Sequence, residues 1–260
     1  CGEIDAAPNL TAAPKALLDE SGGALEPGDT LRYTIVVRNS GTMAATGVTG
    51  ICGSGIIEAI AEMYLAGILT ADGVIDGSLV PRSQRLEPTD RTFSYLIRAV
   101  EPAIRVTQND GRAIQLAKAA LYAGARLLMD RYGIDTVEKI VLTGAFGSHI
   151  DPLYAMVLGM IPDCPLKGVS AAGNAAGTGA RIALVHRAAR TEIARVTRQV
   201  EKVETAVEPR FQAHFVAAMA IPHKTAPCPN LAAAIELPVA RADTATDGAA
   251  SERRRRRRRW

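Results

Sequence analysis

The stretch KIVLTGAFGSHIDP, residues 139–152, decides the fold class of this 260-residue chain. Its apolar run at 140–143 predicts a short buried strand. The glycines that follow predict a tight turn, and Asp151 with Pro152 predicts the N-cap and the first residue of a helix. Strand, glycine-rich turn and helix in this order indicate an α/β layer architecture, in which ligands bind beyond the carboxyl ends of the strands.

A second segment of the same kind follows. A strand near Val169 leads into AGNAAGTGA, residues 172–180, and then into a helix that we expect to reach about Glu204. Backbone N–H groups at a helix N-terminus carry partial positive charge, and glycine lets a ligand approach them closely. Two such loops together predict one site of nucleotide size. For each loop taken alone, the alternative that its glycines serve only tight turns and close packing stays open.

A third glycine-rich stretch, GICGSGIIEAI at residues 50–60, opens an apolar helix. It is not a Walker A loop, because no Gly-Lys-Ser/Thr follows in the chain. A nucleophile elbow at Cys52 would need a buried strand before it and a histidine partner, and the sequence indicates neither. We therefore predict a turn at Gly53, Ser54 and Gly55 that feeds a helix lining a nucleotide cleft.

The clearest helix lies in TQNDGRAIQLAKAALYAGARLLMDRYG, residues 107–133. Thr107 and Asp110 form a capping box, and Gly133 ends the helix. Gln115 and Lys118 lie one turn apart and could flank a purine and its ribose, although such a row is as often a solvated helix face. The predicted buried stripe consists of Ala113, Leu116, Ala117, Ala120, Leu121, Gly124, Leu127 and Leu128.

The first 49 residues have the pattern of a small β module. Apolar and polar residues alternate over 31–38, with Pro-Gly-Asp before this run and Asn-Ser-Gly after it, which predicts a half-buried strand. The segment from about Pro8 to Thr49 resembles the conserved-repeat domain of bacterial surface proteins. Because an immunoglobulin-type sandwich needs about 100 residues, this segment is about half of such a module.

Charge is distributed unevenly along the chain. The formal net charge is +3, but residues 253–259 are all arginine, and without these seven the balance is 23 basic against 27 acidic residues. We predict that residues 231–260 are disordered. The arginine run could bind nucleic acid only nonspecifically through phosphates, and the alternative is a tail without a designed function.

Cysteine use and hydropathy exclude several classes of protein. Cys1, Cys52, Cys164 and Cys228 show no metal-ligand spacing, so we expect no metal site and no disulfide framework. A reducing, cytoplasmic location is the default for such a chain. No apolar run has the length of a membrane span, and no signal peptide opens the sequence, so we expect no membrane association.

Five segments, taken together, resemble the C-terminal domain of the reductive activators of corrinoid proteins. This family belongs to the superfamily of acetate kinase, sugar kinases and actin, in which two ribonuclease-H-like halves close on ATP. The resemblance covers about Gly50 to Leu231 and implies one ribonuclease-H-like α/β half, preceded by a short partial β-sandwich segment. The expected domains are 1–49, 50–230 and a tail at 231–260. The segments are GICGSGIIEAIAEMYLAGIL, TQNDGRAIQLAKAALYAGARLLMD, KIVLTGAFGSHIDPLYAMVLGMIPD, GNAAGTGARIAL and FVAAMAIPH.

The resemblance also implies the residues of a nucleotide site that binds ATP with Mg²⁺. LTGAFG is similar to the adenosine motif of the superfamily, and GNAAGTGA is similar to the second segment connecting the halves. The helix of Gln115 and Lys118 corresponds to one that flanks adenine. No catalytic residue is assigned. The implied site residues are Gly53, Ser54, Gly55, Gln115, Lys118, Gly144, Ala145, Phe146, Gly147, Asn174 and Gly177.

Members of this family use ATP hydrolysis to drive an electron from an iron–sulfur cluster to Co(II) of a corrinoid protein. The implied partners are a corrinoid protein, a ferredoxin-type electron donor and a second copy of the chain. The sequence contains no counterpart of the family's ferredoxin-like domain or of its aspartate–glycine phosphate loop. We therefore expect no iron–sulfur cluster and an incomplete, chimeric activator that is inactive alone. The alternatives are a non-catalytic interaction or dimerisation fragment, and a piece of a surface adhesin.

Overall fold

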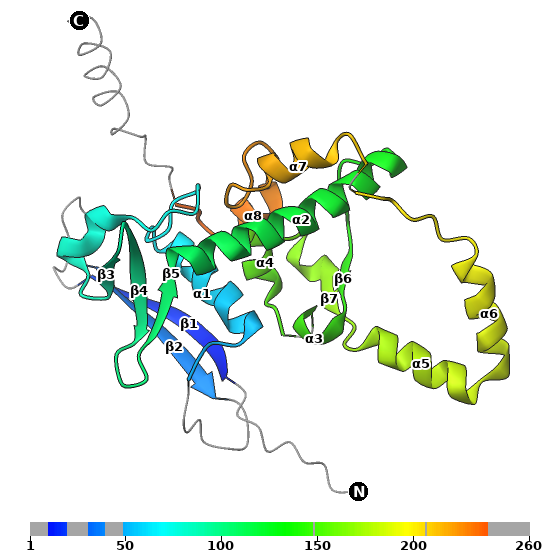
Figure 1. Cartoon of the computed structure of the whole chain (residues 1–260), viewed down its shortest axis with the longest axis horizontal. Coiled ribbons are helices and arrows are strands. Elements are labelled where there is room, and N and C mark those ends of the chain that lie inside the picture. The colour runs from blue at the N-terminus through cyan, green and yellow to red at the C-terminus, as the bar shows by residue number, and fades with distance from the viewer. Residues whose placement is uncertain (1–9, 20–30, 40–48, 148, 206, 239–260) are drawn as a thin grey trace, which may run out of the picture.

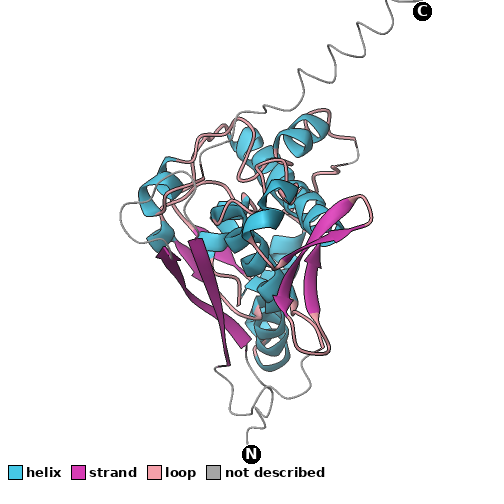
Figure 2. Ribbon diagram, turned by 90° about the vertical axis from the view of Figure 1, so that its left-hand side faces the viewer, coloured by secondary structure: helices cyan, strands magenta, loops and turns pink. Residues whose placement is uncertain are grey.

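The computed structural model describes residues 10–19, 31–39, 49–147, 149–205 and 207–238. A long central helix, α2 (Gln108–Tyr132), runs through the body. Two helices, α5 (Ala175–Val185) and α6 (Arg187–Thr197), form an arm that bows away from the body (Figure 1). Seen from the side, the helices are grouped between strands that lie on either side (Figure 2). None of the helices in these ranges is long and apolar enough to cross a membrane.

The N-terminal segment forms a two-stranded antiparallel sheet. Strand β1 (Leu10–Asp19) pairs with β2 (Leu31–Asn39), and the register shifts between Ala13 and Ala16. Pro14 lies in this irregularity, because proline has no N–H to donate to the ladder. Strand β2 confirms the strand predicted at 31–38. The β-sandwich is not confirmed, since these two strands form a sheet of their own in the described part of the chain.

A second antiparallel sheet has the order β3-β4-β5. Leu86, Tyr95 and Val106 from its three strands are all buried in the main hydrophobic core. The strands are β3 (Leu86–Thr89), β4 (Thr92–Arg98) and β5 (Ile104–Thr107), and the 3-10 helix η1 (Gly77–Arg82) precedes them.

Two helices dominate the body. Helix α1 (Gly53–Leu65) packs on α4 (Pro152–Leu158), and Asp151 and Pro152 begin α4 as predicted. Helix α2 (Gln108–Tyr132) shows the predicted capping box, and Gly133 ends it with a φ of 67°. These boundaries could be predicted because cap chemistry is local to the sequence.

The predicted buried stripe of α2 is wrong in most of its members. Leu116, Leu121 and Leu128 are 43%, 52% and 50% exposed, whereas Gln115 and Lys118 on another face are buried. Helix α2 packs against α7 and against loops whose carbonyl groups accept hydrogen bonds from these polar side chains. A hydropathy pattern cannot detect a face that is buried through such polar contacts.

The second half of the chain alternates strands and helices. Strand β6 (Ile140–Leu142) pairs in parallel with β7 (Val169–Ala171). The helix predicted to run to about Glu204 is instead two helices, because His186 has extended backbone angles and its Nδ1 accepts a hydrogen bond from Ala189 N at 3.1 Å. The remaining elements are α3 (Gly144–Gly147), η2 (Leu166–Gly168), α5 (Ala175–Val185), α6 (Arg187–Thr197), α7 (Phe211–Ala217) and α8 (Pro229–Ala234).

Helix α8 reaches into the segment that the sequence predicts as a tail. Leu231, on this helix, is buried in the main core, and the carboxylate of Asp163 accepts hydrogen bonds from the N–H groups of Asn230 and Leu231 at 3.0 Å each. The first residues after 230 are therefore part of the folded body. The arginine run lies outside the described residues.

Candidate functional site

The two glycine-rich loops lie side by side at the carboxyl ends of β6 and β7. Because these strands are parallel, both loops leave the sheet at the same edge. The N–H of Gly144 donates to the carbonyl of Gly173, and the N–H of Ala172 donates to the carbonyl of Leu142, each at 2.8 Å. The structure thus brings together the segments from which the sequence predicts one site.

Gly144 leaves the backbone open at the point where β6 ends. Its φ is 91°, in the region that favours glycine, and a side-chain Cβ built on it would meet no other atom within 4 Å. A nucleoside could therefore approach this backbone closely, so the loop fits the group that the sequence predicts for it. Of Ala145 and Phe146 only the backbone is described, and it forms the short helix α3.

Gly147 has a different role in the same loop. It is buried, and a Cβ on it would come within 3.0 Å of the backbone carbon of Leu142. This distance is too short for a side chain unless the strand shifts. Gly147 therefore allows α3 to pack closely on the end of β6, whereas Gly144 faces open space.

The second loop begins helix α5. The side-chain oxygen of Asn174 accepts a hydrogen bond from Gly177 N at 2.8 Å, which makes Asn174 the N-cap. A Cβ at Gly177 would come within 2.7 Å of the Asn174 amide nitrogen, so glycine is needed for this cap. The cap orients the first turn of α5 beside the Gly144 loop, and the positive end of its dipole favours an anion there.

The turn at Gly53, Ser54 and Gly55 begins α1. Its N-cap is Cys52, whose Sγ accepts a hydrogen bond from Gly55 N at 3.4 Å. The hydroxyl of Ser54 lies 3.4 Å from the same sulfur, and Cys52 is exposed. These contacts give the turn a helix-capping role, and its place in a nucleotide cleft stays a prediction.

Gln115 and Lys118 tie α2 to two loops. The Gln115 amide donates to the carbonyls of Asp72 at 2.9 Å and Met219 at 3.0 Å. The Lys118 ammonium donates to the carbonyl of Pro222 at 3.0 Å and to that of Ala220. Burial lowers the pKa of Lys118 to about 7. The structure thus gives both side chains a packing role, and their role beside adenine stays a prediction.

His223, to which the sequence assigned no role, orders the loop that covers this part of α2. Its Nδ1 accepts hydrogen bonds from Thr225 N at 3.1 Å and Ala226 N at 2.9 Å. Its ring lies 4.7 Å from that of Tyr122, measured between centroids. Burial, together with the charges of Lys118 and His214, lowers the pKa of His223 to about 4. Both rings line a shallow pocket between α2 and α4.

The low pKa of His223 makes the chain less stable in mild acid. Between pH 4 and 6.5 the unfolded state binds more protons at this residue than the folded state, so the free energy of unfolding falls as the pH falls through this range. The loss is at most about 1.4 kcal/mol per pH unit, and solvent screening at this half-buried ring reduces it. Urea unfolding at pH 6.5 and 4.5 measures it. We expect a smaller pH dependence in His223→Gln, and equal dependence in both proteins would contradict this role.

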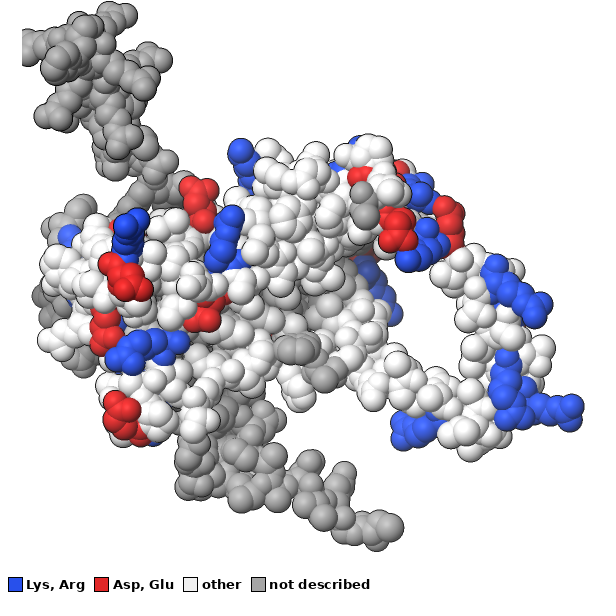
Figure 3. Space-filling model, viewed as in Figure 1, with Lys and Arg blue, Asp and Glu red and all other residues white. Residues whose placement is uncertain are grey.

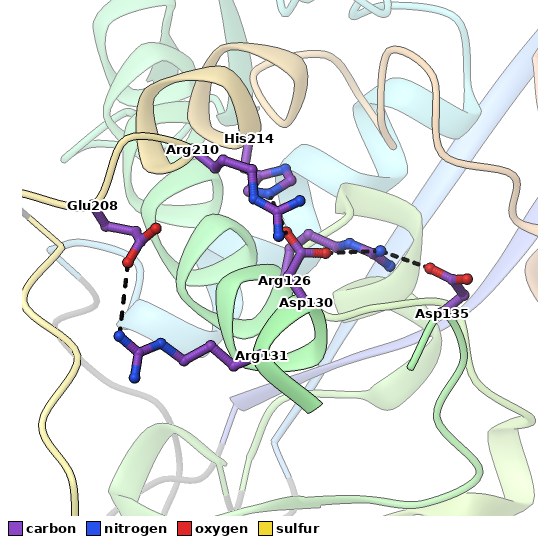
Figure 4. A network of polar contacts seen from close by, with 7 residues as sticks. All are labelled: Arg126, Asp130, Arg131, Asp135, Glu208, Arg210 and His214. Carbon is purple, nitrogen blue, oxygen red and sulfur yellow. Dashed lines mark hydrogen bonds and ion pairs between the residues drawn. The ribbon is translucent and has the colours of Figure 1, made fainter. Parts of the chain in front are cut away.

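Asp130 anchors the segment that returns from the arm (Figure 4). Its carboxylate, only 6% exposed, contacts Arg126 at 2.9 Å, Arg210 at 3.0 Å and His214 at 2.8 Å. Burial acts to raise the pKa of Asp130, but the hydrogen bond from His214 and the two arginines outweigh it, so the pKa is lowered. The network fixes α7 on the C-terminal end of α2. Sequence reasoning missed it, because His214 lies 84 residues from Asp130.

Comparisons with known proteins agree on one family. The family model described as the C-terminal domain of RACo, the ASKHA domain, matches residues 21–232. The corrinoid activation enzyme RamQ of Eubacterium limosum is 36% identical over 178 residues, which are 64% of this chain and 30% of that protein. A solved structure, a reductive activator for corrinoid, iron–sulfur protein, matches with a TM-score of 0.63 and 28% identity over 73% of this chain and 31% of its own.

The chain therefore spans about a third of the length of the relatives that it matches. The family model begins at residue 21, within the segment that the sequence predicts as a separate β module. All the elements from α1 to α7, including both glycine-rich loops, lie inside the matched range.

Proposed function

Because this chain belongs to the family of the C-terminal domain of RACo, the ASKHA domain, we propose that it binds ATP as part of a corrinoid-activating protein. One observation supports nucleotide binding best. The parallel pairing of β6 and β7 places the open backbone of Gly144 next to the capped N-terminus of α5. In an open α/β sheet this edge is where ligands bind.

In the proposed complex each loop has its own part. The backbone of 144–147 lies against the nucleoside, and the first turn of α5 faces the phosphates. No group of three His, Cys, Asp or Glu residues gathers as a metal site in the part of the chain that the structure describes. Mg²⁺ in nucleotide sites is held by phosphate oxygens and water with only one or two carboxylates, so it would enter this site together with the nucleotide. Since phosphoryl transfer depends on positioning and charge neutralisation, we propose that hydrolysis requires groups from outside this chain.

Calorimetric titration with ATP and Mg²⁺ tests nucleotide binding. We expect saturable binding that is at least about tenfold weaker in Gly144→Val, a loss of about 1.4 kcal/mol. Valine is strained at a φ of 91°, and its side chain would fill the space open to the nucleoside.

The matched control is Gly124→Ala, within α2. A Cβ there also meets no atom within 4 Å, and alanine favours the helix by up to about 1 kcal/mol. We expect this variant to bind ATP as the wild type does, with equal or higher thermal stability. Wild-type affinity in Gly144→Val, or a folded wild-type chain that does not bind, would contradict the proposed site.

A corrinoid protein is the proposed macromolecular partner. The two relatives are named for corrinoid activation and for a corrinoid, iron–sulfur protein. Sedimentation velocity of the chain mixed with a corrinoid protein, with and without ATP, measures complex formation. We expect a faster-sedimenting species, and separate boundaries at tens of micromolar would contradict this partner. A ferredoxin-type electron donor stays a prediction from the resemblance.

A non-catalytic interaction fragment is the second candidate function. It is favoured by large apolar side chains that are exposed on α2 and on the arm. On this account the chain folds and associates but shows no heat of ATP binding, so the same titration distinguishes the two functions.

A further inference from the structure

Helices α5 and α6 form an arm in which no residue is buried. The arm bows away from the body in Figure 1, and a turn at His186 joins its two helices. Helices that carry an apolar stripe normally bury it against another element. The apolar surface of the arm instead has no cover within the part of the chain that the structure describes. Its large apolar side chains are 42–86% exposed, and they are Ile182, Leu184, Val185, Ile193 and Val196.

The bend of the arm carries its most exposed apolar side chains. Leu184 and Val185 are the last two residues of α5, and they are 78% and 86% exposed. The Arg190 guanidinium donates to the carbonyl of Ala183 at 3.2 Å, so the first turn of α6 is tied to the end of α5. Arg181 precedes Leu184 and Val185 by three and four residues, which places it on the same side of α5. The bend therefore presents an apolar tip bordered by arginines.

Helix α6 separates apolar from basic residues. On a 3.6-residue period, Ile193 and Val196 lie on the side opposite Arg187 and Arg198. All the residues of α6 are accessible to solvent, so both sides are available to a partner. A helix with one apolar and one basic side, neither of them buried, is typical of helices that lie at a membrane surface.

Positive charge is concentrated on the arm, whereas the rest of the chain is acidic. Residues 175–200 contain five arginines and one glutamate, a net charge of +4. Five of the 30 basic residues of the chain are thus on the arm and seven are in the arginine run, which leaves 18, whereas 26 of the 27 acidic residues lie outside the arm. Figure 3 shows basic side chains along the arm. The charge of the arm therefore suits an anionic partner.

An anionic lipid surface matches both properties of the arm. Lipid phosphates attract arginine side chains, and the acyl chains below them accept apolar side chains. A nucleic acid would neutralise the arginines but leave the apolar side of the arm in water. The cores of protein interfaces are enriched in aromatic side chains, and residues 175–200 contain no Phe, Trp or Tyr. A lipid surface therefore fits the arm better than either class of macromolecule.

We infer that the arm binds the surface of a membrane that contains anionic lipid. Leu184, Val185 and Ile193 enter the boundary between headgroups and acyl chains, and the arginines stay in the headgroup layer, where their long side chains reach the phosphates. Such a helix lies in the plane of the surface and needs no spanning segment. Span length and leader segments, on which the expectation of no membrane association depends, do not report on this kind of binding. The inference does not depend on ATP binding.

Co-sedimentation of the full chain with lipid vesicles tests the inference. We expect binding to phosphatidylcholine vesicles that contain about 30% phosphatidylglycerol, and binding at least about tenfold weaker to pure phosphatidylcholine. Leu184→Glu and Val185→Glu should each weaken binding to the anionic vesicles at least about tenfold, because each places a charge where an apolar side chain enters the membrane. Val100→Glu is the matched control. It makes the same change of charge at a position 67% exposed in the β4–β5 connection, and it should bind as the wild type does.

The arginine run could bind anionic vesicles by itself, so its contribution is measured separately. The three glutamate substitutions are repeated in a chain whose arginines at 253–259 are all replaced by glutamine. The difference between Val185→Glu and Val100→Glu should stay at least about tenfold in this chain. Hydrogen exchange then locates the contact, and anionic vesicles should slow amide exchange in peptides that cover residues 178–196.

Three outcomes of the vesicle experiments would overturn the inference. They are no binding of the wild type to anionic vesicles, equal binding of the arm variants and Val100→Glu, and binding that is lost altogether with the arginine run. Slower exchange of the arm with RNA or polyglutamate but not with vesicles would also overturn it, in favour of a nucleic acid or an acidic protein as the partner.

Discussion

Gly159→Ala should lower the free energy of unfolding by about 2–5 kcal/mol. Gly159 follows the last residue of α4 with a φ of 68°, where an L-residue is strained by about 1–2 kcal/mol. In addition, its Cβ would lie 1.9 Å from the carbonyl oxygen of Pro222. This clash is with backbone, so the loop must move, and overpacking of this kind costs about 1–3 kcal/mol.

Gly67→Ala separates the two causes. Gly67 follows α1 with a φ of 69°, but a Cβ there meets no atom within 4 Å. It should therefore lose only the backbone strain, about 1–2 kcal/mol. Urea unfolding of both variants gives the comparison. An equal loss of unfolding free energy in the two variants would contradict a contribution from the clash between the new Cβ at position 159 and Pro222.

Lys118→Ala should have the second largest effect, about 3 kcal/mol. It leaves the half-buried carbonyls of Ala220 and Pro222 without their donor, at roughly 1–3 kcal/mol each when no water replaces it, and it opens a cavity where the buried Lys118 side chain lay. Removing a buried cation recovers part of this loss. Lys118→Met keeps most of the side-chain volume and should be less destabilised. Urea unfolding measures both, and wild-type stability in Lys118→Ala would contradict the packing role.

The pH dependence gives an independent check on Lys118. Its folded pKa of about 7 lies below the ordinary value, so between pH 7 and about 10 the unfolded state binds more protons. Wild-type stability should therefore rise with pH in this range, and that of Lys118→Met should rise less. A variant at this position is destabilised for reasons unrelated to adenine, so its ATP affinity is informative only where it is shown to be folded.

Elements defined by neighbouring residues could be predicted from the sequence. The alternation over 31–38, the capping box at Thr107 and the N-cap at Asp151 are local signals, and the structure has β2, α2 and α4 where these signals place them. The sequence predicts one long helix after Asn174, and the break that divides it into α5 and α6 could not be predicted. Its break depends on the backbone of His186, a residue that does not by itself end a helix.

The buried face of α2 depends on partners far along the chain. Gln115 and Lys118 are buried because carbonyls more than 100 residues later accept their hydrogen bonds. The juxtaposition of the glycine loops could be predicted, since parallel strands end at one edge. The loop of His223 and the contacts of Asp130 could not, because they depend on how α7 and the chain after it return to α2.

Hydrogen exchange at the two glycine loops tests the central claim most directly. Amide exchange is measured by mass spectrometry on the chain with and without ATP and Mg²⁺, with peptides that cover residues 142–147 and 172–178. The account predicts that ATP slows exchange in both peptides together, because the loops form one site, and that Gly144→Val loses both effects. Slower exchange around Gln115 and Lys118 with neither loop affected would contradict it.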